Sequence, residues 1–192
     1  MNAQKRVRAW DISGTLPSDQ NPDPDYTVGV LMSKDKSNRY CIEDVIRDRR
    51  RYGGVLELII QTAKNDGSDI EIIIPRDPGA AGLAYASQLV REIAEEGFSA
   101  RMRATNQSKV TRFAPFASCC EAGGVDIVKA PWNDILFHEL EAFDGSRKGH
   151  DDICDAVSDA FMSLTRSVIL PNMSLPDYRV PNPINEIRGM NN

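Results

Sequence analysis

The stretch KGHDDICDAVSDAF, residues 148–161, places four carboxylates within nine positions: Asp151, Asp152, Asp155 and Asp159. Apolar residues recur between them at steps of three and four, which predicts a helix over 151–166 with one buried face. Acids three or four apart on a helix lie about 5–6 Å from one another and repel by a few tenths of a kcal/mol. A divalent cation bound among them would remove this repulsion.

A second explanation of the pattern needs no ligand. Asp151 can cap the helix and Asp152 can be a first-turn acid favoured by the helix dipole. Asp155 and Asp159 would then simply face water. The closing helix alone does not decide between the two explanations.

Two acids far away in the chain favour the cation. Asp11 lies inside a predicted strand over 6–13, between apolar neighbours, where an unpaired carboxylate is costly. Asp77 follows an apolar run over 69–75 in a Gly/Pro turn, and functional residues collect at such strand ends in α/β sheets. If these two strands are neighbours, both acids meet the start of the closing helix. An all-oxygen site of this kind suits Mg²⁺ or Mn²⁺.

The elements that must position these acids follow from the apolar periodicity. The first part of the chain predicts three consecutive strands, over 6–13, 26–33 and 39–46. Helices then alternate with short strands: the helices are predicted over 53–67, 80–97, 109–122 and 131–143, and the strands over 69–75, 98–104 and 125–130. This order predicts an α/β fold with a mixed central sheet flanked by helices.

Length and composition limit the function classes. The 192 residues, 41% of them hydrophobic, suit one domain, which we place at 1–170, followed by a proline-rich extended tail over 171–192. The net charge of −5 does not attract nucleic acid, so a DNA partner requires a local basic patch or bound cations. No apolar run is long enough to cross a membrane.

The cysteines and histidines give little support for a zinc site. The four cysteines lack CxxC spacing and the chain has two histidines, so reduced, buried thiols are expected. His138 is interpreted as structural. His150 has three open interpretations, namely a proton shuttle, a DNA contact or an exposed loop residue. Asp25 is interpreted as a turn residue before the second strand, with metal binding as the alternative.

Five blocks, in this order, resemble one protein family. They are Asp11 in its strand, PRDPGAAG, SKVTRFAPFA, EAGGVDIV and HDDICDAVSDAF. Together, from about Arg8 to about Leu164, they resemble the C-terminal nuclease domain of the large terminase subunit of tailed bacteriophages and prophages. The resemblance implies an RNase H-like fold, related to RuvC resolvases, with three antiparallel strands followed by parallel βα units. It also implies an endonuclease that cuts double-stranded concatemeric viral DNA with two Mg²⁺ or Mn²⁺ ions.

The resemblance also implies roles for particular residues. The catalytic acids carried over are Asp11, Asp77, Asp152 and Asp155, and Asp151 is a further candidate metal ligand. Many relatives place a glutamate at the end of the fourth strand, where this chain has Pro75, so Asp77 takes that role here. Lys109 and Arg112 match a family block and are expected to bind DNA phosphates, together with Arg103. The arginine run over 47–51 can equally be a solvated charged face.

The family context implies partners beyond this chain. No GxxxxGK[ST] motif is present, so we expect an isolated nuclease domain without the ATPase motor that the family carries N-terminally. The full-length protein would act in the bacterial host cytoplasm with that motor, a small terminase subunit and the portal. Two alternatives remain open, a RuvC-like junction resolvase and a non-catalytic module of the same fold that binds DNA or the portal.

Overall fold

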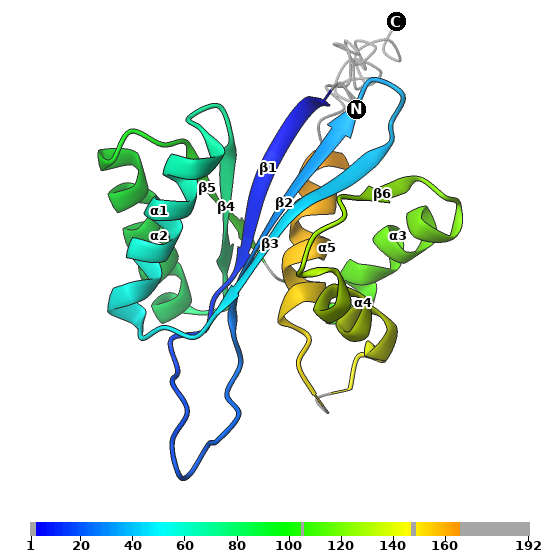
Figure 1. Ribbon diagram of the computed structural model, residues 1–192. Coiled ribbons are helices and arrows are strands. Elements are labelled where there is room, and N and C mark those ends of the chain that lie inside the picture. The colour runs from blue at the N-terminus through cyan, green and yellow to red at the C-terminus, as the bar shows by residue number, and fades with distance from the viewer. Residues whose placement is uncertain (1–2, 105, 147–148, 166–192) are drawn as a thin grey trace, which may run out of the picture.

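The fold is built on one central sheet. The computed structural model describes residues 3–104, 106–146 and 149–165. These residues form a six-stranded sheet in the order β5-β4-β1-β2-β3-β6, with helices on both faces (Figure 1). The predicted tail over 171–192 lies outside the described residues. None of the helices in the described ranges is long and apolar enough to cross a membrane.

The strand directions match the predicted mixed sheet. Strands β1 (Ala3–Asp11), β2 (Thr27–Asp35) and β3 (Tyr40–Asp48) pair antiparallel in sequence order. On one side β4 (Glu71–Arg76) pairs parallel with β1, and β5 (Ala100–Ala104) pairs parallel with β4. On the other side β6 (Val125–Ile127) pairs parallel with β3. The prediction of three antiparallel strands followed by parallel units is therefore confirmed.

The helices lie close to their predicted positions. They are α1 (Tyr52–Asp66), α2 (Ala80–Glu95), α3 (Lys109–Glu121), α4 (Asn133–Ala142) and α5 (Asp152–Thr165). Gly67 has a φ of 102°, a conformation that glycine adopts without strain, and it ends α1 as predicted. The prediction that Pro131 opens α4 is wrong by two residues, because residues 131–132 form a turn in which the Asn133 side chain accepts a hydrogen bond from the Ala130 N–H.

Alternation along β1 divides the interior into two cores. Figure 1 shows α3, α4 and α5 on one side of the sheet and α1 and α2 on the other. Val7 and Ala9 belong to the core on the α5 side, whereas Trp10 belongs to the core on the α1 side. Successive strand residues point to opposite faces, so the single strand β1 contributes to both cores. Across the pair with β2, the Trp10 ring covers Gly29, where any Cβ would lie about 2.9 Å from the ring.

A buried arginine joins three elements on the α1 side. Arg8 is 2% exposed and its guanidinium contacts both Asp66 carboxylate oxygens, at 2.6 and 2.7 Å. It also donates to Asp44 on β3, at 2.9 Å, and to the carbonyl oxygen of Gly29. Because every partner accepts a hydrogen bond from the charged group, the pairing holds the end of α1 against β1 and β3.

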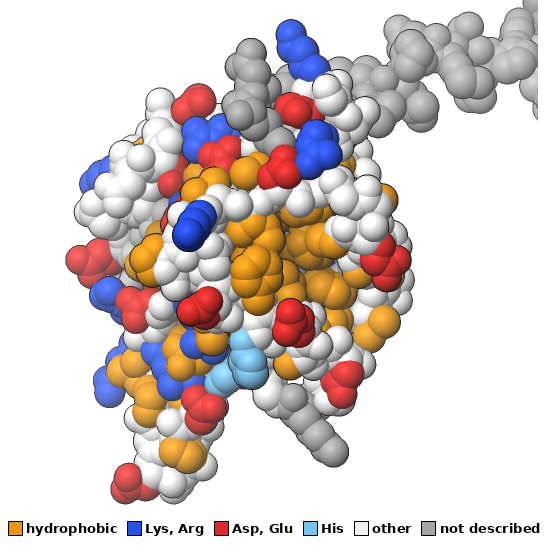
Figure 2. Space-filling view, turned by 45° about the vertical axis from the view of Figure 1, so that its right-hand side comes forward, with side chains coloured by type: hydrophobic (Ala, Val, Ile, Leu, Met, Phe, Trp, Pro, Cys, Tyr) orange, Lys and Arg blue, Asp and Glu red, His pale blue; other side chains and the backbone are white. Residues whose placement is uncertain are grey.

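The face that carries α3 and α4 is partly apolar. Figure 2 shows hydrophobic side chains gathered in a hollow on this side of the molecule. Three apolar side chains are exposed here: Val110 on α3, Val128 directly after β6, and Phe137 on α4. The cysteines are free thiols. Cys41 and Cys154 are buried as expected, but Cys120 is exposed on α3, which corrects the expectation of four buried thiols.

Candidate active site

The ends of three elements meet at one edge of the sheet. Strand β1 ends at Asp11, its parallel neighbour β4 ends at Arg76, and α5 begins at Asp152. A cavity of about 600 Å³ opens between them. Its lining includes all four predicted catalytic acids and two predicted DNA-binding residues: Asp11, Asp77, Asp152, Asp155, Lys109 and Arg112. The chain therefore gathers acids from three distant segments around one polar space.

Asp11 faces the α5 side because it has the same strand parity as Val7 and Ala9. Burial raises the pKa of its carboxyl well above the usual value, and the negative charges of Asp155 and Asp152 raise it further. A carboxylate in such surroundings favours either a proton or a bound cation. Because the charges of Asp152 and Asp155 act on Asp11, the three carboxylates are close enough to share one site.

Asp152 and Asp155 are both buried, with exposed fractions of 2% and 7%. The alternative in which Asp155 and Asp159 face water is therefore wrong. Burial raises the pKa of the Asp152 carboxyl and of the Asp155 carboxyl, and it is the largest cause of the shift in both. The Asp152 Oδ2 atom accepts a hydrogen bond of 3.0 Å from the Tyr26 N–H, which fixes the carboxylate against the start of β2.

Lys109 neutralises part of the acidic cluster. Its ammonium group lies 2.6 Å from Asp151 Oδ1 and 2.8 Å from Asp155 Oδ2. Burial opposes the charge on this lysine, but the hydrogen bonds to the two carboxylates outweigh that effect and raise its pKa. Asp151, partly buried, thus engages a lysine at the cavity, and its carbonyl accepts the Asp155 N–H in the first turn of α5.

The fourth aspartate of the closing helix has a different role. Asp159 is 2% exposed and accepts hydrogen bonds from Arg103, at 2.8 Å, and from Arg112, at 3.1 Å. Arg112 also donates to Asp155 Oδ1, at 2.5 Å. The two guanidinium groups satisfy Asp159, which does not line the cavity. Its place in the acidic stretch is explained by structural ion pairs.

The second strand-end acid lies at the rim. Asp77 is exposed and lines the cavity from the turn that precedes α2. Pro75 also lines the cavity, in the part of β4 beyond the residues that pair with β1. A proline is compatible with this position because no β1 carbonyl requires its missing N–H.

The cavity has the donor set expected for hard divalent cations. Asp11, Asp152 and Asp155 present carboxylate oxygens, and burial raises the pKa of each carboxyl. Oxygen ligands of this type suit Mg²⁺ or Mn²⁺. These three residues fit a metal site, with Asp77 available at the rim.

A comparison with protein families identifies the domain. Residues 8–164 match the family described as the terminase RNaseH-like domain. The chain belongs to this family. It is therefore a nuclease domain with an RNase H-like fold, as the sequence motifs predicted.

Solved structures are similar to this terminase domain at low sequence identity, and the first of them shares its fold. The yeast mitochondrial Holliday junction resolvase Ydc2 superposes with a TM-score of 0.53 at 10% identity, covering 83% of this chain and 77% of the resolvase. RuvC from Thermus thermophilus in complex with a Holliday junction substrate has a TM-score of 0.44 at 9% identity, covering 81% and 91%. No curated protein sequence matches the terminase domain.

The predicted DNA-binding residues occupy different environments in the terminase domain. The Lys109 side chain is 44% exposed at the cavity, so its ammonium group is accessible. Arg103 and Arg112 are 7% and 6% exposed and hold Asp159. Arg112 also reaches the cavity wall, whereas Arg103 lines a separate pocket beside β5. Phosphate binding by these residues stays a prediction.

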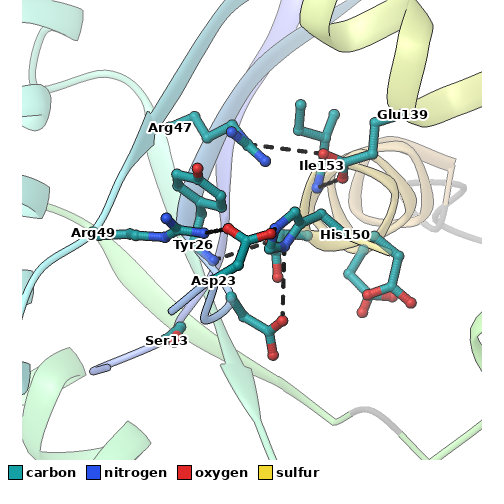
Figure 3. Close-up of polar contacts among 12 residues, drawn as sticks. Ser13, Asp23, Tyr26, Arg47, Arg49, Glu139, His150 and Ile153 are labelled. Carbon is teal, nitrogen blue, oxygen red and sulfur yellow. Dashed lines mark hydrogen bonds and ion pairs between the residues drawn. The ribbon is translucent and has the colours of Figure 1, made fainter. Parts of the chain in front are cut away.

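Sequence reasoning missed a polar cluster beside the cavity. The guanidinium carbons of Arg47 and Arg49 lie 3.3 and 3.7 Å from the centre of the Tyr26 ring, and the His150 ring meets Tyr26 edge-on (Figure 3). Asp23 accepts hydrogen bonds from Arg49 and lies 2.9 Å from His150 Nε2. The solvated-face interpretation is therefore wrong for Arg47 and Arg49, whose side chains are 18% and 16% exposed.

Glu139 was also missed. This α4 residue is 4% exposed, and its Oε1 atom accepts a hydrogen bond of 2.5 Å from the Ile153 N–H in the first turn of α5 (Figure 3). The carboxylate satisfies an N–H group that the helix itself leaves unpaired. A signal was present in the sequence, since residue 139 lies three positions after the buried Leu136 on the predicted helix.

Proposed function

We propose that this domain is the divalent-metal-dependent endonuclease of a DNA-packaging terminase large subunit, which cleaves double-stranded concatemeric viral DNA. The observation that carries the proposal is the convergence of Asp11, Asp152 and Asp155 on one polar cavity, where burial raises the pKa of each carboxyl. Membership of the terminase RNaseH-like family supports the same reaction class.

The side chains support hydrolysis by charge and position. Asp11, Asp152 and Asp155 would hold two Mg²⁺ or Mn²⁺ ions, with Asp77 contributing from the rim. Such ions activate water and stabilise the negative charge that builds up on a phosphodiester. The hydrogen bond from the Tyr26 N–H and the ion pair with Arg112 hold Asp152 and Asp155 in fixed orientations. Preorganised ligands of this kind lower the reorganisation needed during the reaction.

Lys109 has a second role in this proposal. Its ammonium group lies between Asp151 and Asp155 and is partly accessible from the cavity. A bound phosphate would meet this cation at the wall of the site, which fits the predicted phosphate contact. Arg112 would hold Asp155 and Asp159 in position, and Arg103 would hold Asp159.

The test is plasmid cleavage by the purified chain. Supercoiled plasmid should be nicked and linearised in Mg²⁺ or Mn²⁺ and left intact in EDTA. Asp11→Asn and Asp152→Asn, which keep side-chain size, should each lower the rate by about 100-fold or more. Asp126→Asn is the matched control, because Asp126 is an exposed acid on β6 that pairs with Arg39. Cleavage that survives in EDTA, or in both site variants, would exclude this proposal.

A second candidate is cleavage of four-way DNA junctions. The fold similarity to the yeast mitochondrial Holliday junction resolvase supports it. The same acids would serve that reaction, so substrate preference is what distinguishes the junction resolvase from the terminase nuclease. Faster cleavage of a four-way junction than of a linear duplex with the same arms would favour the resolvase. Full DNA binding in EDTA, with no cleavage in any metal, would favour a non-catalytic module.

In the full-length protein we propose an N-terminal ATPase motor, a small terminase subunit and the portal as partners, following the family. A motor that feeds DNA past this domain would couple cutting to packaging. Cleavage by the isolated chain and by the motor-linked protein can be compared directly on the same plasmid.

A further inference from the structure

Three potential ligands converge at the edge of the cavity, and two of them, Asp25 and Asp152, also line it. We call the set Asp11, Asp152 and Asp155, which offers only carboxylate oxygens, the oxygen-only centre. The three potential ligands are Asp25 from the loop between β1 and β2, His150 from the segment before α5, and Asp152 from α5. One ligand atom of each residue lies within 4.8 Å of the other two. The Nδ1 atom of His150 lies 3.5 Å from Asp152 Oδ2 and 3.9 Å from Asp25 Oδ1.

These separations suit a bridging cation better than direct contacts. Both exceed the usual length of an N–H···O hydrogen bond. Zinc binds nitrogen and oxygen ligands at about 2.0–2.2 Å, so two ligands on one ion are separated by about 3–4 Å. Among the described residues, the buried His150 Nδ1 atom has no hydrogen-bond partner. An imidazole nitrogen enclosed in this way requires something to bind.

The opposite side of the histidine ring is fixed. Its Nε2 atom lies 2.9 Å from Asp23 Oδ2, and Asp23 also accepts a hydrogen bond from Arg49 (Figure 3). A carboxylate accepts hydrogen bonds, so the Nε2 atom beside Asp23 is placed to donate, and the Nδ1 atom faces Asp25 and Asp152. Carboxylate–histidine pairs orient metal-binding histidines in this manner.

The remaining ligand is held by the same cluster. Tyr26, next to Asp25 in the chain, lies with its ring within cation–π distance of Arg47 and Arg49 and donates its N–H to Asp152 Oδ2. The buried Asp152 is thus anchored, whereas Asp25 is exposed at the mouth of the site. An ion could enter from the solvent side without disturbing the core.

We propose that Asp25, His150 and Asp152 form a second type of divalent-cation site, which takes Zn²⁺ in preference to Mg²⁺. The mixed nitrogen and oxygen donor set is the reason for this selectivity, because Mg²⁺ prefers oxygen ligands and imidazole suits transition metals. The site shares Asp152 with the oxygen-only centre and goes beyond the proposed DNA cleavage, since ion binding here needs no nuclease activity. An occupied site ties the loop over 12–26 to the start of α5.

Nuclear magnetic resonance of the imidazole nitrogens tests this directly, because the chain has two histidines, His138 and His150. The ¹⁵N-labelled full chain, freed of metal with EDTA and exchanged into buffer, is titrated with Zn²⁺. His138→Gln assigns the two sets of signals. Stoichiometric Zn²⁺ should move the Nδ1 signal of His150 and leave that of His138 in place, whereas Mg²⁺ should move neither.

Calorimetry with three variants completes the test. Asp25→Asn and His150→Gln should each weaken Zn²⁺ binding at this site by about 10-fold or more. Asp11→Asn, which removes a ligand of the oxygen-only centre alone, should leave the His150 response intact. A His150 signal that does not move under Zn²⁺ saturation, or Asp25→Asn and His150→Gln binding Zn²⁺ like the wild type, would overturn the site.

The two proposals fail in distinguishable ways. If only the oxygen-only centre binds metal, Mg²⁺-dependent plasmid cleavage persists and the Nδ1 signal of His150 does not move when Zn²⁺ is added. If the domain is not a nuclease, cleavage is absent while the His150 response to Zn²⁺ remains. The Zn²⁺ titration is recorded on the wild-type chain, and either His138→Gln or His150→Gln can assign its two histidine signals, so one misfolded variant does not remove the test.

Discussion

The four aspartates of residues 151–159 differ in their partners although they share one helix. Asp151 pairs with Lys109, Asp152 accepts the Tyr26 N–H, and Asp155 contacts Lys109 and Arg112. Asp159, one turn further, is enclosed by two arginines. The sequence pattern indicated a charged stripe, but the partners come from α3 and β5 and from the loop before β2. Spacing along one helix does not reveal which acids are neutralised by distant arginines.

Removing the carboxylate charge of Asp159 should destabilise the domain strongly. Asp159→Asn leaves Arg103 and Arg112 buried with one anionic partner fewer, and breaking a buried ion pair from one side costs about 3–5 kcal/mol. The free energy of unfolding, measured by urea denaturation, should fall by about 3 kcal/mol. Glu57→Gln, at an exposed position on α1, is the control and should change it by less than about 0.5 kcal/mol. A small effect at Asp159 would show that the arginines find other acceptors.

The ionised Asp11 carboxylate should lower the free energy of unfolding of the metal-free domain at neutral pH. Its pKa is raised on folding, so its contribution to stability is present at low pH and is lost as pH rises through the raised value. In EDTA at pH 7, Asp11→Asn should therefore unfold at a higher urea concentration than the wild type, by an amount of the order of 1 kcal/mol. The difference should shrink as the pH approaches 4. Asp126→Asn should show no such gain, because a hydrogen bond from Arg39 lowers the pKa of Asp126.

At the scale of elements, the sequence was sufficient to locate the strands and helices. Apolar periodicity located α1 to within one residue and α2 to within two residues at its C-terminal end, because this signal is local. In the loop over 12–26, only Asp25 is interpreted from the sequence, as a turn residue. The packing of this loop depends on contacts of Tyr26 with Arg47 in β3 and with Arg49, which directly follows β3. Such long-range pairings have no local periodicity, which is why the polar cluster was missed.

Two glycines offer a matched test of strand and helix packing. Gly29 lies under the Trp10 ring, so Gly29→Ala forces its new methyl group to within about 2.9 Å of ring atoms. Overpacking of this kind should lower the free energy of unfolding by about 1–3 kcal/mol. At Gly53, in the first turn of α1, no atom lies within 4 Å of a new Cβ, so Gly53→Ala should stabilise by about 0.5 kcal/mol. Thermal unfolding of both variants checks the opposite signs.

At the scale of the whole molecule, charge governs the encounter with DNA. The chain has a net charge of −5, and the cavity gathers acids. Association with a polyanion should therefore depend on bound cations. Composition alone predicts that a DNA partner needs a local basic patch or bound cations, and this stays a prediction. The sequence brought Asp11 to the closing helix only on the condition that its strand and the strand over 69–75 are neighbours, which the pairing of β1 with β4 fulfils.

Duplex DNA binding should accordingly be metal-dependent and salt-dependent. Replacing EDTA with Ca²⁺ at constant ionic strength should raise the affinity for a labelled duplex by about 10-fold, and added NaCl should lower it again. Fluorescence anisotropy measures both effects. Equal affinity in EDTA and in Ca²⁺ would mean that protein cations alone hold the DNA, and Lys109→Ala would then be the next variant to compare.

Side chains alternate between the two faces of β1, so the face on which Asp11 lies depends on the number of residues that precede it in the strand. Val7, Ala9 and Asp11 share one side of the strand, and Arg8 and Trp10 share the other. Inserting or deleting one residue between Arg8 and Asp11 would turn the acid towards α1 and away from α5. Descendants of this gene can therefore change the length of the strand between Arg8 and the acid only in steps of two.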